Sequence, residues 1–198
     1  EVCLVGSEMC IRDSIEGEGS DTVTVQGVAT LNGASYEVMP DRIEVGTYLV
    51  AAAATGGSLR VEGICPEVLG VVRNKLVKTG ADLDEGGDWI SLDMRDERPK
   101  AVDIVTEPFP GFPTDMQAQF TALNTVAQGT SRVTEAVFEN RLMQAHEMKR
   151  MGADIVIEGD SARITGRPSL QGAPVMASDL RASALSLIHI SEPTRHTS

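Results

Sequence analysis

Hydrophobic and polar positions divide the middle of the chain into two successive repeats of one pattern. In each repeat an apolar helix is followed by an alternating strand, a second helix and two further strands. The first repeat is expected to have helices at 41–55 and 66–79 and strands at 58–62, after 80–82, and at 89–93. The second is expected to have helices at 114–128 and 142–151 and strands at 131–135, 155–157 and 162–165. Strands at 22–26 and 102–106 precede them, so the pattern of each repeat is β-α-β-α-β-β.

The spacing of matching residues supports the repeat. Val61 and Val133 lie 72 residues apart, and Asp41 lies 74 residues before Asp115. A third copy begins at 178–183 and is expected to be truncated. A repeat with two helices and a sheet cannot bury its apolar helix faces alone, so the repeats must pack together. The fold class is therefore α/β (α+β), with two repeats and part of a third.

The two ends differ from the middle. Residues 1–14 and 185–198 keep no clean helix or strand period and resemble translated sequencing adapter, so we expect the native part to span 15–184. Cys3, Cys10, His189 and His196 fall in these ends. They could be combined into a metal site, but adapter sequence is the favoured interpretation.

Composition excludes several classes of function. The chain of 198 residues has 29 acidic and 17 basic residues, a net charge of -12, which argues against binding to nucleic acid or to an anionic membrane surface. Hydrophobic residues make up 41%, as in globular proteins. No apolar stretch is long enough to span a bilayer, no secretory signal is visible, and three cysteines form no disulfide framework or zinc spacing. These features predict an acidic, soluble, cytoplasmic protein.

Aspartates stand at the three helix starts, at Asp41, Asp115 and Asp179. Thr114 and Gln117 fit a capping box, which would place Asp115 in the first helical turn, where free N–H groups stabilise a carboxylate. Alternatively, Asp115 is an ionised carboxylate at the rim of a cleft that accepts a proton from a substrate hydroxyl. The prolines of 108–113 stiffen the segment before it. The sequence leaves both interpretations open.

The loop 138–141 lies between a predicted strand and a helix, a common position for ligand-binding residues. Glu139 could accept and Arg141 could donate hydrogen bonds to a ligand, although a solvated charged loop is the simpler interpretation. His146 is expected at the surface. Cys65, at a helix start, could have a lowered thiol pKa, but a packed, inert cysteine is favoured.

Several long motifs in one order resemble the UDP-N-acetylglucosamine 1-carboxyvinyltransferases, a family of enolpyruvyl transferases. The resemblance covers nearly all of 15–184. The motifs are VMPDRIEVGTYLVAAA (38–53), GADLDEGGDWISLDM (80–94), RPKAV (98–102), FPTDMQAQFTALN (112–124), VFENR (137–141), RMGADI (150–155) and VMASDLRAS (175–183).

The resemblance implies two domains of three repeats each, an inside-out barrel fold with the active site between the domains. This chain would be most of the second domain, with the first domain as its missing partner. The implied reaction transfers the enolpyruvyl group of phosphoenolpyruvate to the 3-hydroxyl of UDP-N-acetylglucosamine and releases phosphate, in the first committed step of peptidoglycan synthesis. No metal or organic cofactor is implied, and the fragment alone is expected to be inactive.

The resemblance also implies roles for single residues. Asp115 matches the aspartate proposed to take the proton of the 3-hydroxyl, and Val137 matches a position that contacts the UDP-sugar through its backbone. Four further positions line the cleft near the reacting groups: Glu139, Arg141, Asp179 and Arg181. The family commonly has histidine where this chain has Gln144. Its loop cysteine belongs to the other domain, and Cys65 does not match that motif.

Two alternatives stay open. The related enolpyruvyl-shikimate phosphate synthases share the repeat but should lack the motifs at 112–119 and 137–141 in this form. A non-catalytic binding module could also be built from the same repeat. The acidic balance indicates that most cations for the phosphoenolpyruvate anion lie outside this chain.

Overall fold

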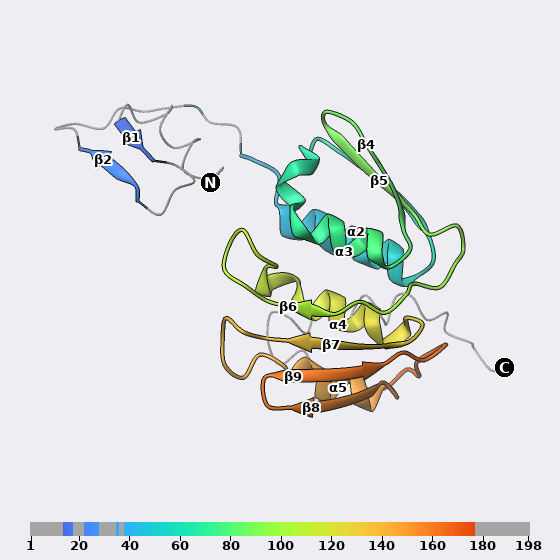
Figure 1. Cartoon of the computed structure of the whole chain (residues 1–198). Helices are drawn as coiled ribbons and strands as arrows, with labels where there is room; N and C mark the ends of the chain where they lie inside the picture. Colours follow the sequence, from blue (N-terminus) through green and yellow to red (C-terminus); the bar gives the residue numbers. More distant parts are fainter. Residues whose placement is uncertain (1–13, 18–21, 28–34, 36–37, 177–198) are drawn as a thin grey trace. The chain divides into compact units, whose positions relative to one another are not determined.

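A computed structural model describes residues 14–17, 22–27, 35 and 38–176 (Figure 1). The chain separates into two compact parts, 1–40 and 41–198. In the first part, strand β1 (Ser14–Glu16) pairs antiparallel with β2 (Thr24–Gln26), with Ile15 opposite Val25. The strand predicted at 22–26 is therefore present only at 24–26, and it belongs to a separate two-stranded sheet instead of the sheet of the first repeat.

The first repeat of the second part begins with helix α2 (Arg42–Ala54). Asp41 caps this helix, because its Oδ1 accepts a hydrogen bond from the backbone N–H of Ile43 at 2.8 Å. The elements that follow are β3 (Ser58–Glu62), the 3-10 helix η1 (Pro66–Leu69), α3 (Val71–Lys78), β4 (Asp82–Glu85) and β5 (Trp89–Asp93). The three strands form an antiparallel sheet in the order β3-β5-β4.

The second repeat has the same helix-strand-helix-strand-strand order, but an additional strand, β6, precedes it in its sheet, and its 3-10 helix precedes the first helix instead of the second. Its elements are β6 (Ile104–Val105), the 3-10 helix η2 (Thr114–Met116), α4 (Gln117–Val126), β7 (Thr130–Thr134), α5 (Gln144–Arg150), β8 (Asp154–Glu158) and β9 (Ser161–Thr165). Its sheet has the order β6-β7-β9-β8. β6 runs parallel to β7, and the other neighbours are antiparallel.

Strand pairing confirms the repeat residue by residue. Ser58 faces Asp93 in the first sheet, and Thr130 faces Thr165 in the second, so both partners are shifted by 72 residues. The helices of the two repeats are joined as well, because Gln119 Nε2 of α4 donates to Thr47 Oγ1 of α2 at 3.0 Å. The two repeats thus meet directly where α2 and α4 pack together.

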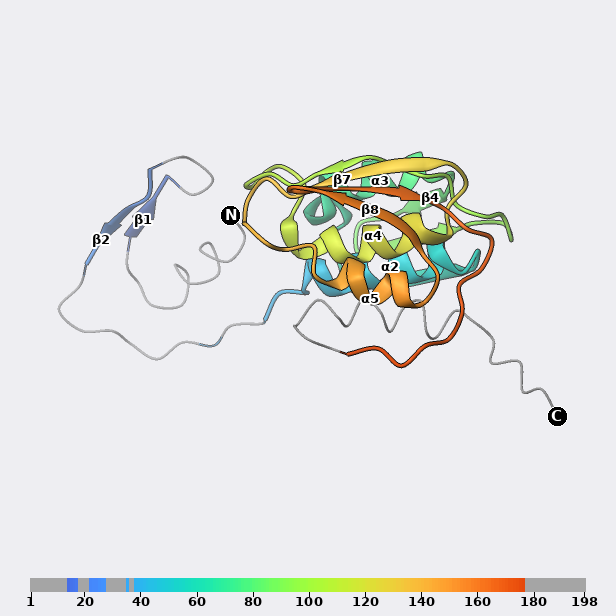
Figure 2. The same ribbon diagram turned by 90° about the horizontal axis from the view of Figure 1, so that it is seen from below.

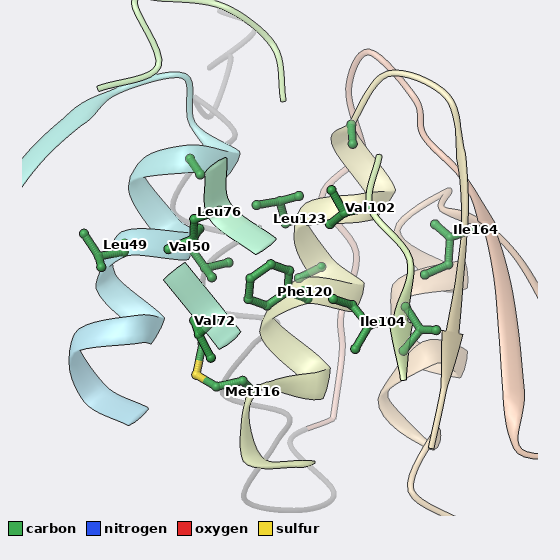
Figure 3. Close-up of a cluster of buried hydrophobic side chains, with 14 of the residues drawn as sticks. Leu49, Val50, Val72, Leu76, Val102, Ile104, Met116, Phe120, Leu123 and Ile164 are labelled. Carbon is green, nitrogen blue, oxygen red and sulfur yellow. The ribbon is translucent and has the colours of Figure 1, made fainter. Parts of the chain in front are cut away.

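The hydrophobic core lies around these two helices. Figures 1 and 2 show α2 and α4 side by side, with the four-stranded sheet covering α4. Phe120 of α4 is fully buried, and its ring meets Phe112 edge-on with centroids 5.2 Å apart. Side chains of α2, α3, α4, β6 and β9 gather around it (Figure 3). The prediction that each repeat needs its neighbour to bury its helices agrees with this packing.

Two local predictions are corrected. The helix expected at 66–79 is split at Gly70, whose φ of +48° interrupts the helix between η1 and α3. The capping box at Thr114 and Gln117 is absent: Pro113 stands at the N-cap, the Thr114 hydroxyl bonds to Glu135, and the Gln117 side chain is buried against Gln144. The two side chains that would have capped the helix are instead hydrogen-bonded elsewhere, Thr114 to the buried carboxylate of Glu135 and Gln117 to the buried amide of Gln144.

Several predictions lie outside the described residues. These are the third copy at 178–183 and the adapter-like ends, apart from Ser14, which begins β1. Within the described residues, no helix combines the length and apolar character needed to cross a membrane.

Candidate functional site

The candidate site lies where the C-terminal end of β7 meets the N-terminal end of η2. At its base is Glu135, which directly follows β7 and is 3% exposed. Its Oε1 accepts hydrogen bonds from Thr106 Oγ1 at 2.8 Å and from the amides of Val137 and Phe138 at 3.2 and 3.3 Å. Its Oε2 accepts from Thr114 Oγ1 at 2.8 Å. A buried carboxylate needs such donors, and here they tie three segments of chain together.

Arg141 joins this base to the surface. Its Nη1 donates to Thr114 Oγ1 at 2.9 Å, and its guanidinium stacks on the Phe138 ring at 3.8 Å. Nη1 also lies 3.8 Å from Asp115 Oδ1, so the predicted site residues Asp115 and Arg141 are brought together. The Arg141 side chain is 19% exposed, whereas that of Asp115 is 64% exposed. A positioned cation therefore stands beside an accessible carboxylate.

A second pair of polar side chains links the same two segments. Gln144 Nε2 donates to Gln117 Oε1 at 2.8 Å, with both side chains buried. This contact and the one between Arg141 and Thr114 each join residues that lie 27 positions apart. At Gln144, where the sequence resemblance implies a histidine, the side-chain amide holds the start of α4 against the start of α5.

The other predicted site residues are placed as follows. The amide of Val137 is bonded to Glu135, so a backbone contact from Val137 to a ligand would use its carbonyl oxygen. Glu139 is exposed in the loop, next to Asn140, whose φ is +58°. Asp179 and Arg181 lie outside the described residues.

A cavity of about 220 Å³ opens beside the loop that carries Arg141. Phe138, Arg141, Leu142, Met143, His146 and Asp160 are among the residues that line it. His146 is exposed at this rim, as its surface assignment from sequence requires. The cavity thus adjoins the Arg141 side of the site.

Cys65 is not among the residues that line this cavity. It is exposed rather than packed, and its Sγ donates to Glu67 Oε2 at 2.7 Å. This hydrogen bond raises the pKa of the Cys65 thiol, which is opposite to the lowering that a helix start could have caused. Among the residues that the structure describes, no three His, Cys, Asp or Glu side chains are grouped closely enough to hold a metal ion.

The sequence did not single out Glu135, Thr106 or the hydroxyl of Thr114 as parts of the site. A signal was available, because Glu135 follows an alternating strand at a position where the alternation predicts an inward-facing side chain. An acidic residue at such a position demands several donors, but the sequence does not say which ones.

The arrangement has clear chemical capacities. An exposed carboxylate accepts a proton from a bound hydroxyl, and a guanidinium held 3.8 Å away orients that carboxylate and attracts an anionic substrate. The Thr114 hydroxyl, itself bonded to Glu135, holds one N–H group of a guanidinium that has five N–H donors in all.

Comparisons with known proteins identify the family. The model of the EPSP synthase (3-phosphoshikimate 1-carboxyvinyltransferase) family matches residues 11–195. Solved structures with the same fold include the enolpyruvyl transferase NikO from Streptomyces tendae, with 24% identity and a TM-score of 0.78 over 94% of this chain. An EPSP synthase from Acinetobacter baumannii matches 90% of this chain with 20% identity and a TM-score of 0.66.

The chain spans 45% of the length of each of these solved proteins, so it corresponds to about half of such an enzyme. Both matches agree with the mixed α/β repeats described above. The match of the family model over most of the chain shows that this protein belongs to the EPSP synthase family of enolpyruvyl transferases.

Proposed function

We propose that the chain is part of the second domain of an enolpyruvyl transferase that acts on UDP-N-acetylglucosamine. The reaction moves the enolpyruvyl group of phosphoenolpyruvate to the sugar 3-hydroxyl, releases phosphate, and is the first committed step of peptidoglycan synthesis. The placement of the accessible Asp115 carboxylate beside the Arg141 guanidinium carries this proposal. Membership of the family supports enolpyruvyl transfer from phosphoenolpyruvate as the reaction class.

In this reaction a bond forms between the sugar 3-oxygen and C2 of the enolpyruvyl group, and the bond from C2 to the phosphate oxygen breaks. The proton of the hydroxyl must leave as the new bond forms. Asp115 is the proposed acceptor of that proton, because its carboxylate is exposed and lies 3.8 Å from the Arg141 guanidinium. Arg141 would also face the negative charge of the substrates.

UDP-N-acetylglucosamine is proposed as the substrate that accepts the enolpyruvyl group because of two sequence motifs. FPTDMQAQ at 112–119 and VFENR at 137–141 resemble the UDP-N-acetylglucosamine enzymes, and Asp115 of the first motif lies 3.8 Å from Arg141 of the second. Shikimate 3-phosphate is the second candidate acceptor, because the matching family model is described as 3-phosphoshikimate 1-carboxyvinyltransferase. Val137, Glu139, Asp179 and Arg181 are proposed as further substrate contacts.

A binding experiment distinguishes the two acceptors. UDP-N-acetylglucosamine and shikimate 3-phosphate are titrated separately into the isotope-labelled chain, and the NMR signals of the 137–141 loop are followed. We expect the UDP-sugar to shift these signals and shikimate 3-phosphate to leave them unchanged. Asp115→Asn should weaken the response, whereas Asp84→Asn makes the same change of charge on β4 and should not. A response to shikimate 3-phosphate alone would overturn the proposed acceptor.

A further inference from the structure

We infer that Glu135 is a positioning residue, which holds the Arg141 guanidinium in its binding geometry through Thr114 and Phe138. The inference rests on the proposed function only in giving Arg141 a substrate to bind. We call the Glu135 carboxylate, the hydroxyls of Thr106 and Thr114, and the amides of Val137 and Phe138 the Glu135 hub.

The direction of the hydrogen bonds makes Thr114 a connector. The Thr114 hydroxyl donates to Oε2 of the Glu135 carboxylate at 2.8 Å. The lone pairs of that hydroxyl are then available to Arg141 Nη1, which donates at 2.9 Å. A neutral amide at position 135 could offer its NH₂ group to Thr114 instead, and the direction of the bond to Arg141 would no longer be fixed.

Glu135 also fixes the second support of Arg141. The Phe138 ring stacks on the guanidinium at 3.8 Å, and the Phe138 amide donates to Glu135 Oε1 at 3.3 Å. Thr106 Oγ1 extends this support, since it donates to Glu135 and accepts from the amide of Ala136 at 2.9 Å. One buried carboxylate therefore orients both groups that hold Arg141.

The two repeats show that the fold itself does not require this carboxylate. The Glu135 amide donates to Asp160 O at 2.9 Å, and the Gly63 amide makes the matching bond to Asp88 O at 2.7 Å. Both bonds join equivalent backbone positions, 72 residues apart in the register of the strands. Gly63 has no side chain, so the first repeat forms the same junction without a carboxylate. Glu135 stands in the repeat that carries Asp115 and Arg141.

Substitutions in the complete chain test the inference. In Glu135→Gln and Thr114→Val, we expect the guanidinium N–H signals of Arg141 to move toward those of a free arginine and to exchange faster with water. Arg141→Lys identifies these signals by removing them. The affinity for UDP-N-acetylglucosamine should fall about tenfold in each variant, because a buried hydrogen bond to a charged group is lost.

A double variant and a matched control separate positioning from general destabilisation. If Glu135 acts through Thr114, Glu135→Gln combined with Thr114→Val should weaken binding little more than either change alone. Asn124→Ala removes two buried hydrogen bonds to the backbone of Val102 in the same repeat. It should lower the melting temperature and leave the Arg141 signals in place.

Each outcome decides between the possibilities. Unchanged Arg141 signals in Glu135→Gln, or in Thr114→Val if the first variant does not fold, would overturn the inference whatever the melting temperature. Failure of the unmodified chain to bind UDP-N-acetylglucosamine would instead contradict the proposed acceptor. The Arg141 signals would still report on the Glu135 hub in that case.

Discussion

Two stacked arginines allow the role of Arg141 to be tested at the scale of single residues. Arg141 stacks on Phe138 and Arg60 stacks on Trp89, both at 3.8 Å, but Arg141 alone lies beside Asp115 among the described residues. Lysine keeps the charge and loses the planar donors and the stacking. We expect Arg141→Lys to weaken binding of UDP-N-acetylglucosamine about tenfold, measured by NMR titration, through loss of charged hydrogen bonds.

Arg60→Lys is the control for this change. It removes a stack of the same geometry from the other repeat, and both variants should lose about 0.5–1 kcal/mol of unfolding free energy or less. Binding should be unaffected in Arg60→Lys. Equal loss of binding in the two variants would show that stacking stabilises the chain and that Arg141 has no special part in recognition.

The reactivity of Cys65 tests the effect of its neighbour. The hydrogen bond to Glu67 raises the pKa of the thiol, so less thiolate is present at any pH below that pKa, and alkylation is slowed. Glu67→Gln should lower the pKa and speed alkylation by iodoacetamide at pH 8. Mass spectrometry of the Cys65 peptide measures this rate separately from the other cysteines. A rate that falls or stays constant would contradict the assigned cause.

The more exposed residues of the candidate site were easier to predict from sequence than the buried residue that supports them. The motif around Asp115 and the loop around Arg141 were identified from sequence, and the structure brings the two side chains to 3.8 Å. Glu135 was not identified, because its importance comes from donors in three segments that are distant in sequence. Thr114 was assigned to a helix cap for the same reason. The local sequence matches a capping box, whereas Glu135, the residue that Thr114 actually bonds to, is distant in sequence.

At the scale of elements, Gly166 shows how closely β9 and α4 approach each other. A Cβ at this position would lie 1.7 Å from the carbonyl oxygen of Ala127, which follows α4 and is already bonded to Arg98. Gly166→Ala should therefore lower the unfolding free energy by about 3 kcal/mol, since neither backbone has room to move freely. Chemical denaturation followed by circular dichroism measures this change.

Gly172 provides the control for this element-level change. It has no atom within 4 Å of the position that a Cβ would occupy. Gly172→Ala should shift stability by less than about 1 kcal/mol, because it only reduces the freedom of the unfolded chain. Similar losses in both variants would show that the contact between Gly166 and Ala127 is not a tight one.

Element order was predictable because each repeat carries its own pattern of alternation and its own helix-ending glycine. The 72-residue spacing seen at Val61 and Val133 reappears in the register of both sheets. Boundaries were less predictable where tertiary contacts decide them. The strand expected at 102–106 is confined to 104–105, and the backbone of Val102 is bonded to the side chain of Asn124 instead.

At the scale of the whole molecule, the two repeats share a backbone and differ in chemistry. The junction after β3 is closed by Gly63 and the junction after β7 by Glu135, with the same backbone bond in each. The buried polar network and the exposed Asp115 belong to the second repeat. The two repeats thus provide the same backbone scaffold, and different residues at a few equivalent positions make the second repeat the candidate site.

The proposed activity is expected to need residues beyond this chain. The chain spans 45% of its solved relatives, and its net charge of -12 is unfavourable for holding phosphoenolpyruvate, which is itself an anion. We expect no phosphate release from the chain alone with both substrates, and release after a recombinant first domain is added. Turnover by the chain alone would contradict the proposal that the cations which bind phosphoenolpyruvate lie outside this chain.

Asp115→Asn completes the test in the reassembled enzyme. The amide cannot take the proton of the sugar hydroxyl, so kcat should fall about 10²- to 10⁴-fold. Because the side chain is 64% exposed, stability should change by less than about 0.5 kcal/mol. A fall in apparent affinity with kcat preserved would instead assign Asp115 to substrate positioning. Loss of a group that takes the proton in the transition state lowers kcat, whereas loss of a group that only binds the substrate leaves kcat unchanged.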